Sequence, residues 1–110
     1  IEGLEYTCRT NQEEIFGPVV TLTPFDSEEE VLKMANSTAY GLAATIWTHN
    51  LNRAHRVAAG VDSGIIWINC WLVRDLRTLF GGMKASGVGR EGGYEALHFF
   101  TEPKNVCLQF

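Results

Sequence analysis

The chain has 110 residues, a net charge of −4 and 45% hydrophobic residues, which is ordinary for a globular protein. Its nine Lys and Arg residues are scattered rather than clustered, which excludes a nucleic-acid groove, and its apolar runs are too short to span a membrane. The length favours one domain, and no signal-peptide pattern opens the chain.

Residues 18–25 are rich in Val, Thr and Leu and predict a first strand. Ser27 and Glu30 form a capping-box pattern, and apolar residues at helical spacing follow, so a helix is expected over 28–36. A second apolar strand is expected over 42–48.

Asn50 can cap a second helix over 51–59, with Gly60 as its stop. Residues 64–70 predict a third strand, and its lack of alternation is typical of a strand buried on both faces. The order is β-α-β-α-β, which implies parallel strands joined by crossover helices.

The segment 71–91 has little predicted regular structure, whereas 93–100 reads as a short helix and 104–110 as a final strand. A loop of about twenty residues is unusual in a small domain unless it is functional. Ligands in α/β sheets bind beyond the carboxyl ends of strands, and this loop begins at such an end. We therefore expect the binding chemistry there.

Three cysteines, Cys8, Cys70 and Cys107, are widely spaced and match no metal-ligand pattern, so no metal site is expected. They fit the reduced thiols of a cytoplasmic protein. Cys70 is not favoured as a nucleophile, because no histidine stands in an arrangement that would activate it. The chain opens at Ile1 within a polar stretch, from which we expect a fragment, a processed product or an incomplete chain.

Two motifs stand out. Residues 13–18 read Glu-Glu-Ile-Phe-Gly-Pro, which by itself indicates a turn that introduces a strand. Residues 78–93 carry six glycines around a Lys and an Arg-Glu pair, which is incompatible with a regular helix or strand. The spacing does not match the patterns of phosphate-binding loops, and no buried strand leads directly into it.

Together the two motifs resemble the C-terminal part of an aldehyde dehydrogenase. By this resemblance Glu14 would hydrogen-bond the ribose hydroxyls of NAD and Phe16 would pack near the nicotinamide. A carboxylate can accept from two hydroxyls at once, and an aromatic edge suits a planar ring. The family's Phe that lines the aldehyde tunnel corresponds to Phe80. Leu79 stands where the family usually has Pro, and its freer φ would loosen the turn that presents Phe80.

The resemblance gives structural roles to Lys84, Arg90 and Glu91. An ion pair between Arg90 and Glu91 would fix the shape of the loop. In the family the catalytic Cys, the general-base Glu and the oxyanion-holding Asn lie upstream of anything present in this chain, so no catalytic residue is assigned.

The segment 71–78 contains Arg74 and Arg77, which can be read as surface arginines beside Asp75. It is also similar to the branch of the family that acts on 2-hydroxymuconic and 2-aminomuconic semialdehydes. Counting back from Phe80, Arg74 falls where the family's substrate-facing residue lies, and a guanidinium there would clamp a substrate carboxylate in a two-pronged fashion. Arg77 is the weaker candidate.

The sequence therefore predicts an α/β fold, a β-α-β-α-β part of a parallel-sheet aldehyde dehydrogenase catalytic domain over 1–103, with an oligomerisation strand over 104–110. The implied function is NAD-dependent oxidation of a carboxylate-bearing semialdehyde by the full-length protein. The implied partners are the rest of the dehydrogenase chain, the aldehyde and other subunits of a homo-oligomer. The chain alone would be inactive. The alternative is a stand-alone, non-catalytic α/β interaction module.

Overall fold

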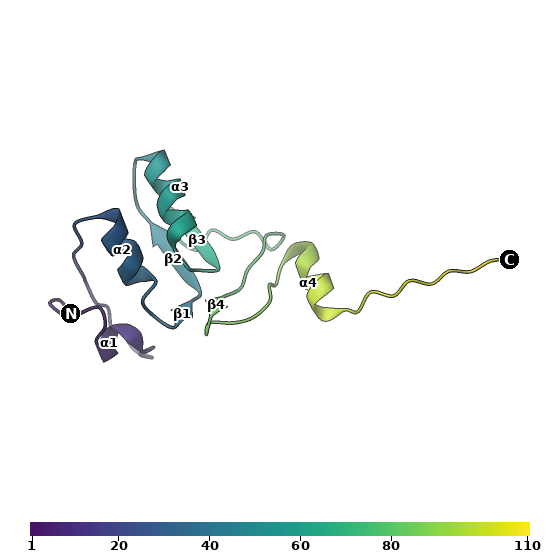
Figure 1. The fold of residues 1–110 in the computed structure, drawn as a ribbon, viewed down its shortest axis with the longest axis horizontal. Helices are drawn as coiled ribbons and strands as arrows, with labels where there is room; N and C mark the ends of the chain where they lie inside the picture. The colour runs from purple at the N-terminus through teal and green to yellow at the C-terminus, as the bar shows by residue number, and fades with distance from the viewer.

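The structure, a computed structural model, describes residues 1–110 and has a mixed α/β architecture (Figure 1). The elements in chain order are α1 (Arg9–Gln12), α2 (Glu28–Ala35), β1 (Tyr40–Gly41), β2 (Ala43–Ile46), α3 (Leu51–Gly60), β3 (Ile65–Ile68), β4 (Met83–Lys84) and α4 (Gly93–Phe100). The predicted α/β class and the three predicted helices are confirmed.

The predicted caps form. Ser27 Oγ accepts a hydrogen bond from the Glu30 amide at 3.1 Å, and the Glu30 carboxylate accepts from the amide of Asp26 at 2.8 Å. At the start of α3, Asn50 Oδ1 accepts from the Arg53 amide at 2.9 Å. These bonds satisfy first-turn donors that otherwise have no partner, which is why both helices begin where they do.

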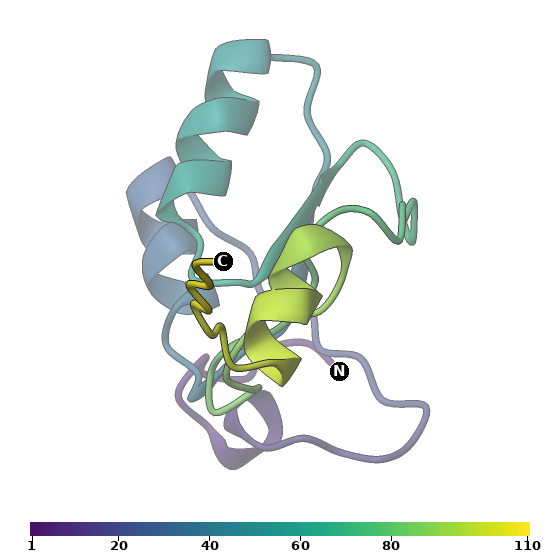
Figure 2. The ribbon, with the colours of Figure 1, turned by 90° about the vertical axis from the view of Figure 1, so that its right-hand side faces the viewer.

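The helices α2 and α3 lie side by side, as Figures 1 and 2 show, and a charged contact joins them. Glu28 accepts hydrogen bonds from Arg56 and Arg53, each as short as 2.8 Å. Hydrogen bonding by Arg56 and then Arg53 lowers the pKa of the Glu28 carboxyl below its usual value.

The helix α3 connects two parallel strands. β2 pairs with β3 in parallel, with Ala43 opposite Ile65 and Ile46 opposite Ile68, so the predicted parallel pairing is confirmed. A second, antiparallel pair joins β1 to β4, with Tyr40 opposite Lys84. The second pair was not predicted, and it brings the glycine-rich segment back against the start of the sheet.

Two predicted strands are absent from the structure. Within 18–25 only Leu22 forms an isolated bridge, to Glu2, and 104–110 is an extended tail without a partner strand. A strand is defined by pairing, and no other strand of this chain lies beside either segment. The short helix α1 was also not predicted.

The described chain has a small core. Ala54 and Trp67 are the buried hydrophobic residues, 2% and 7% exposed. The Cα radius of gyration is 18.4 Å, compared with about 13 Å for a compact domain of this length. The helix α4 and the tail extend away from the rest, as Figure 1 shows. None of the helices is long and apolar enough to cross a membrane.

Candidate functional site

The loop that follows β3 is anchored at its start. Asn69, in the left-handed region with a φ of 53°, exchanges two hydrogen bonds of 2.8 Å with the main chain of Thr48. Trp67 Nε1 donates to the carbonyl oxygen of Val73 at 2.7 Å, and its ring meets the edge of Trp71 at a centroid distance of 5.0 Å. The backbone just before residue 74 is therefore held to the strand pair.

Arg74 lies over an aromatic ring. Its guanidinium carbon is 4.2 Å from the centroid of the Phe80 ring, a favourable cation–π distance. Its Nη2 donates to Glu91 Oε1 at 2.5 Å, whereas Nε and Nη1 have no acceptor in the protein. The Arg74 side chain is 37% exposed. The arrangement thus holds a cation in a fixed orientation with donors still free.

Arg77 is placed differently. It donates to both carboxylate oxygens of Asp75, and its side chain is 89% exposed. These hydrogen bonds lower the pKa of the Asp75 carboxyl below its usual value. Both arginines are exposed, but they differ in their partners: the charge of Arg77 is matched by its neighbour Asp75, whereas Arg74 contacts Phe80 and Glu91.

The expected ion pair between Arg90 and Glu91 is wrong. Arg90 Nη1 instead donates to two main-chain carbonyl oxygens, those of Gly82 at 2.9 Å and Gly89 at 2.7 Å. Adjacent residues on an extended backbone point to opposite sides, so Glu91 is free to face Arg74. Arg90 does fix the loop, but through the backbone.

Two contacts hold the glycine-rich loop against the strands. A Cβ at Gly64, the residue before β3, would lie 1.5 Å from the carbonyl oxygen of Gly81, so the two backbones touch where no side chain fits. Lys84 holds the other side of the loop: its Nζ donates to the carbonyl oxygens of Asn36 and Thr38 at 2.9 and 3.2 Å. The structural role expected for Lys84 is consistent with these contacts.

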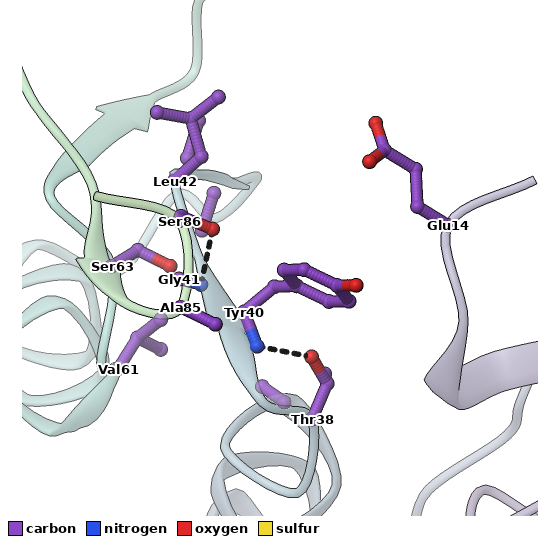
Figure 3. Close-up of a pocket in the computed structure, with 12 residues that line it drawn as sticks. Glu14, Thr38, Tyr40, Gly41, Leu42, Val61, Ser63, Ala85 and Ser86 are labelled. Carbon is purple, nitrogen blue, oxygen red and sulfur yellow. Dashed lines mark hydrogen bonds between the residues drawn. The ribbon is translucent and has the colours of Figure 1, made fainter. Parts of the chain in front are cut away.

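Glu14 lines a separate pocket of about 610 Å³. Figure 3 shows Glu14 across the pocket from Ser86, with the ring of Tyr40 between them. Ser86 Oγ accepts from the amide of Gly41 at 2.9 Å, whereas the Glu14 carboxylate has no hydrogen-bond partner in the protein. Phe16 does not line this pocket and is 95% exposed. The candidates thus form two groups, Glu14 in this pocket and Arg74 with Phe80 in the loop.

The three thiols, Cys8, Cys70 and Cys107, are all free. Cys8 and Cys70 are partly exposed and Cys107 is exposed. No group of three or more His, Cys, Asp or Glu side chains is arranged to hold a metal ion.

Comparison with known proteins decides the family. The model of the aldehyde dehydrogenase family matches residues 1–106. The chain belongs to the aldehyde dehydrogenase family. The 2-hydroxymuconic semialdehyde dehydrogenase of Pseudomonas putida is 60% identical over 107 residues, which cover 97% of this chain and 22% of that protein. The 2-aminomuconic semialdehyde dehydrogenase of Danio rerio is 55% identical over 109 residues, with 99% and 22% covered.

Solved structures share the fold. HpcC from Thermus thermophilus matches with a TM-score of 0.88 and 45% identity over 98% of this chain and 22% of that one. An aldehyde dehydrogenase from Bacillus cereus in complex with NAD+ matches with a TM-score of 0.87 and 46% identity, covering 92% and 21%. The chain thus spans about a fifth of the length of the curated relatives and solved structures that it matches.

The pairing of Glu91 with Arg74 is the feature of this aldehyde dehydrogenase chain that sequence reasoning missed. The two residues are 17 positions apart, and the adjacent Arg90 offered a simpler partner. The sequence offered no signal for this contact, because the segment was expected to lack regular structure.

Proposed function

We propose that this chain serves as the C-terminal part of an NAD-dependent dehydrogenase that oxidises a carboxylate-bearing semialdehyde to the corresponding acid. The observation that carries the proposal is Arg74, an oriented guanidinium over Phe80, of which Glu91 engages only one N–H of Nη2, so that one parallel pair of N–H donors is still free. A carboxylate needs two parallel N–H donors, and a planar guanidinium supplies them. The names of the similar semialdehyde dehydrogenases support this substrate class.

The Glu14 pocket fits the ribose of NAD. An unpartnered carboxylate beside an open pocket can accept hydrogen bonds from two neighbouring hydroxyls. The exposed ring of Phe16, two residues further along, is available to pack against a planar ring. NAD, when bound, supplies the hydride acceptor for the oxidation. The role of these two side chains is to hold and orient the cofactor.

We assign no catalytic residue to this chain. Cys8, Cys70 and Cys107 take part in none of the contacts around Arg74 or Glu14, and a nucleophilic thiol needs an activating base beside it. In the proposal the attacking thiolate is supplied by the rest of a cytoplasmic dehydrogenase, and these 110 residues alone are inactive. The unpaired tail 104–110 would add a strand to a neighbouring subunit of a homo-oligomer.

Replacing Arg74 by Ala in the complete enzyme tests the proposal. Removing one partner of a desolvated charge pair costs about 2–5 kcal/mol, which is roughly 30- to 4,000-fold. In the complete enzyme we expect a loss of at least about 30-fold in kcat/KM for 2-hydroxymuconic semialdehyde. Hexanal, a neutral aldehyde of matched length, should lose little.

Arg77→Ala is the matched control. Its guanidinium is engaged by Asp75 and is largely solvated, so its loss should have a milder effect on the carboxylate-bearing substrate. If Arg74→Ala reduced kcat/KM equally for both aldehydes, Arg74 would only shape the loop, and the assignment of the substrate class would be wrong.

A further inference from the structure

Glu91 is connected to both members of the proposed carboxylate site. Its side chain accepts from Arg74 Nη2 at 2.5 Å. Its main-chain N–H and carbonyl oxygen exchange two hydrogen bonds with Phe80, both 2.8 Å long, as an isolated antiparallel bridge. Glu91 is therefore fixed relative to the Phe80 ring by its backbone and can act as a fixed support for the guanidinium.

The guanidinium of Arg74 is consequently restrained in two directions. The Phe80 ring, 4.2 Å from the guanidinium carbon, covers one face, and the Glu91 carboxylate holds the Nη2 edge. Glu91 engages one N–H of Nη2, so the second N–H of Nη2, the Nε–H and the N–H groups of Nη1 remain unpartnered, which leaves one parallel pair of donors that includes Nη2. An Arg side chain has many rotamers, so a site that already holds it in one orientation loses less entropy when a carboxylate binds.

We propose that Glu91 is a positioning residue for recognition of the substrate carboxylate: it orients Arg74 without contacting the substrate. This inference rests on the proposed function and names a second residue on which that function depends. Glu91 also reduces the net charge of the site, which works against binding of an anion. The proposal requires that the gain from orientation exceeds this repulsion, and the Glu91→Gln variant tests that by removing the charge while keeping an acceptor oxygen.

The test uses three substitutions of Glu91 in the complete enzyme, assayed with 2-hydroxymuconic semialdehyde and with hexanal. Glu91→Ala should raise KM for the carboxylate-bearing substrate about 2- to 12-fold, the effect of freeing one rotamer-rich side chain, with little change in kcat or in either constant for hexanal. Glu91→Gln keeps an acceptor oxygen at the same reach and should recover most of the loss. Glu91→Asp keeps the charge but is too short to reach, so it should resemble Ala.

A double-mutant cycle between Arg74 and Glu91 and a matched control variant complete the design. In an Arg74→Ala background, Glu91→Ala should cause no further loss of preference for the carboxylate-bearing substrate. Glu95→Ala, which removes an exposed carboxylate in the first turn of α4, should leave KM for both substrates unchanged. If Glu91→Ala does not fold, the test rests on the other two variants: KM should be close to the wild-type value in Glu91→Gln and raised in Glu91→Asp.

The outcomes separate the two proposals. Equal losses on both aldehydes in Arg74→Ala overturn the substrate class itself. If Arg74→Ala discriminates but the Glu91 variants leave the ratio of KM values unchanged, only the role of Glu91 is overturned. That role is also overturned if Glu91→Ala lowers KM for the carboxylate-bearing substrate. It is overturned as well if the Glu91→Asp variant behaves like the wild type and the Glu91→Gln variant like Glu91→Ala, because the charge of Glu91 would then be the property that matters.

Discussion

The exposed apolar surface of this chain predicts that the 110 residues, expressed alone, self-associate. A folded monomer of 12.3 kDa exposes about 6,100 Å², whereas this chain exposes 8897 Å², an excess of about 2,800 Å². If somewhat over half of the excess is apolar, covering it is worth about 40 kcal/mol as an upper bound, at about 25 cal/mol per Å². That is several times the 5–15 kcal/mol stability of an ordinary domain.

Sedimentation velocity at micromolar concentration is the appropriate assay, since it separates a monomer from a distribution of larger species. Removing the unpaired tail 104–110 should reduce association without abolishing it, because most exposed apolar side chains lie before residue 104. A stable monomer that unfolds in one cooperative transition would refute the reasoning. It would favour the alternative of a self-sufficient, non-catalytic interaction module.

Three further predictions apply to the complete enzyme. Gly64→Ala should lower stability by about 1–3 kcal/mol or more, because its Cβ would lie 1.5 Å from the carbonyl oxygen of Gly81; an unchanged Tm would contradict this. Glu14→Gln should weaken NAD binding and slow hydride transfer, measured by calorimetry and stopped-flow NADH formation; unchanged values would contradict the ribose role. The pKa of Glu28 is lowered in the folded state, so its stabilising contact with Arg56 and Arg53 is complete above about pH 4.5 and is lost as pH falls through the folded-state pKa. The stability of Glu28→Gln should therefore depend less steeply on acid pH than that of the wild type. Identical curves of stability against pH would contradict this.

The elements that could be predicted from sequence are those whose causes are local. Ser27 and Asn50 cap helices through hydrogen bonds within one turn, so α2 and α3 begin at the predicted positions. The parallel pairing of β2 with β3 was predictable because a helix lies between the two apolar runs. A crossover connection of this kind makes the two strands parallel. The segment 18–25 failed as a strand because a strand also needs a neighbour, which this chain does not provide.

The contacts of the candidate site also separate into those that the sequence could suggest and those that depend on the fold of the loop. The family resemblance assigned both Arg74 and Phe80 to the substrate tunnel, and the structure brings their side chains together. The contact between Arg74 and Glu91 could not be anticipated, because it depends on how the loop returns to pair with Phe80. The predicted pair of Arg90 and Glu91 failed because Arg90 reaches backbone carbonyls, which carry no sequence signal.

The hydrogen-bonded bridge between Phe80 and Glu91 can compensate for Leu79, which stands where the resemblance to the family would place a proline. A proline would restrict the backbone before Phe80 by fixing its own φ. Here both main-chain groups of Phe80 are hydrogen-bonded to Glu91, so the ring is held from across the loop. One residue thus restrains both the ring and the guanidinium that lies over it. A loop built in this way can keep its carboxylate-binding geometry without the proline, and for that reason we expect substrate preference to be more sensitive to Glu91 than to Leu79.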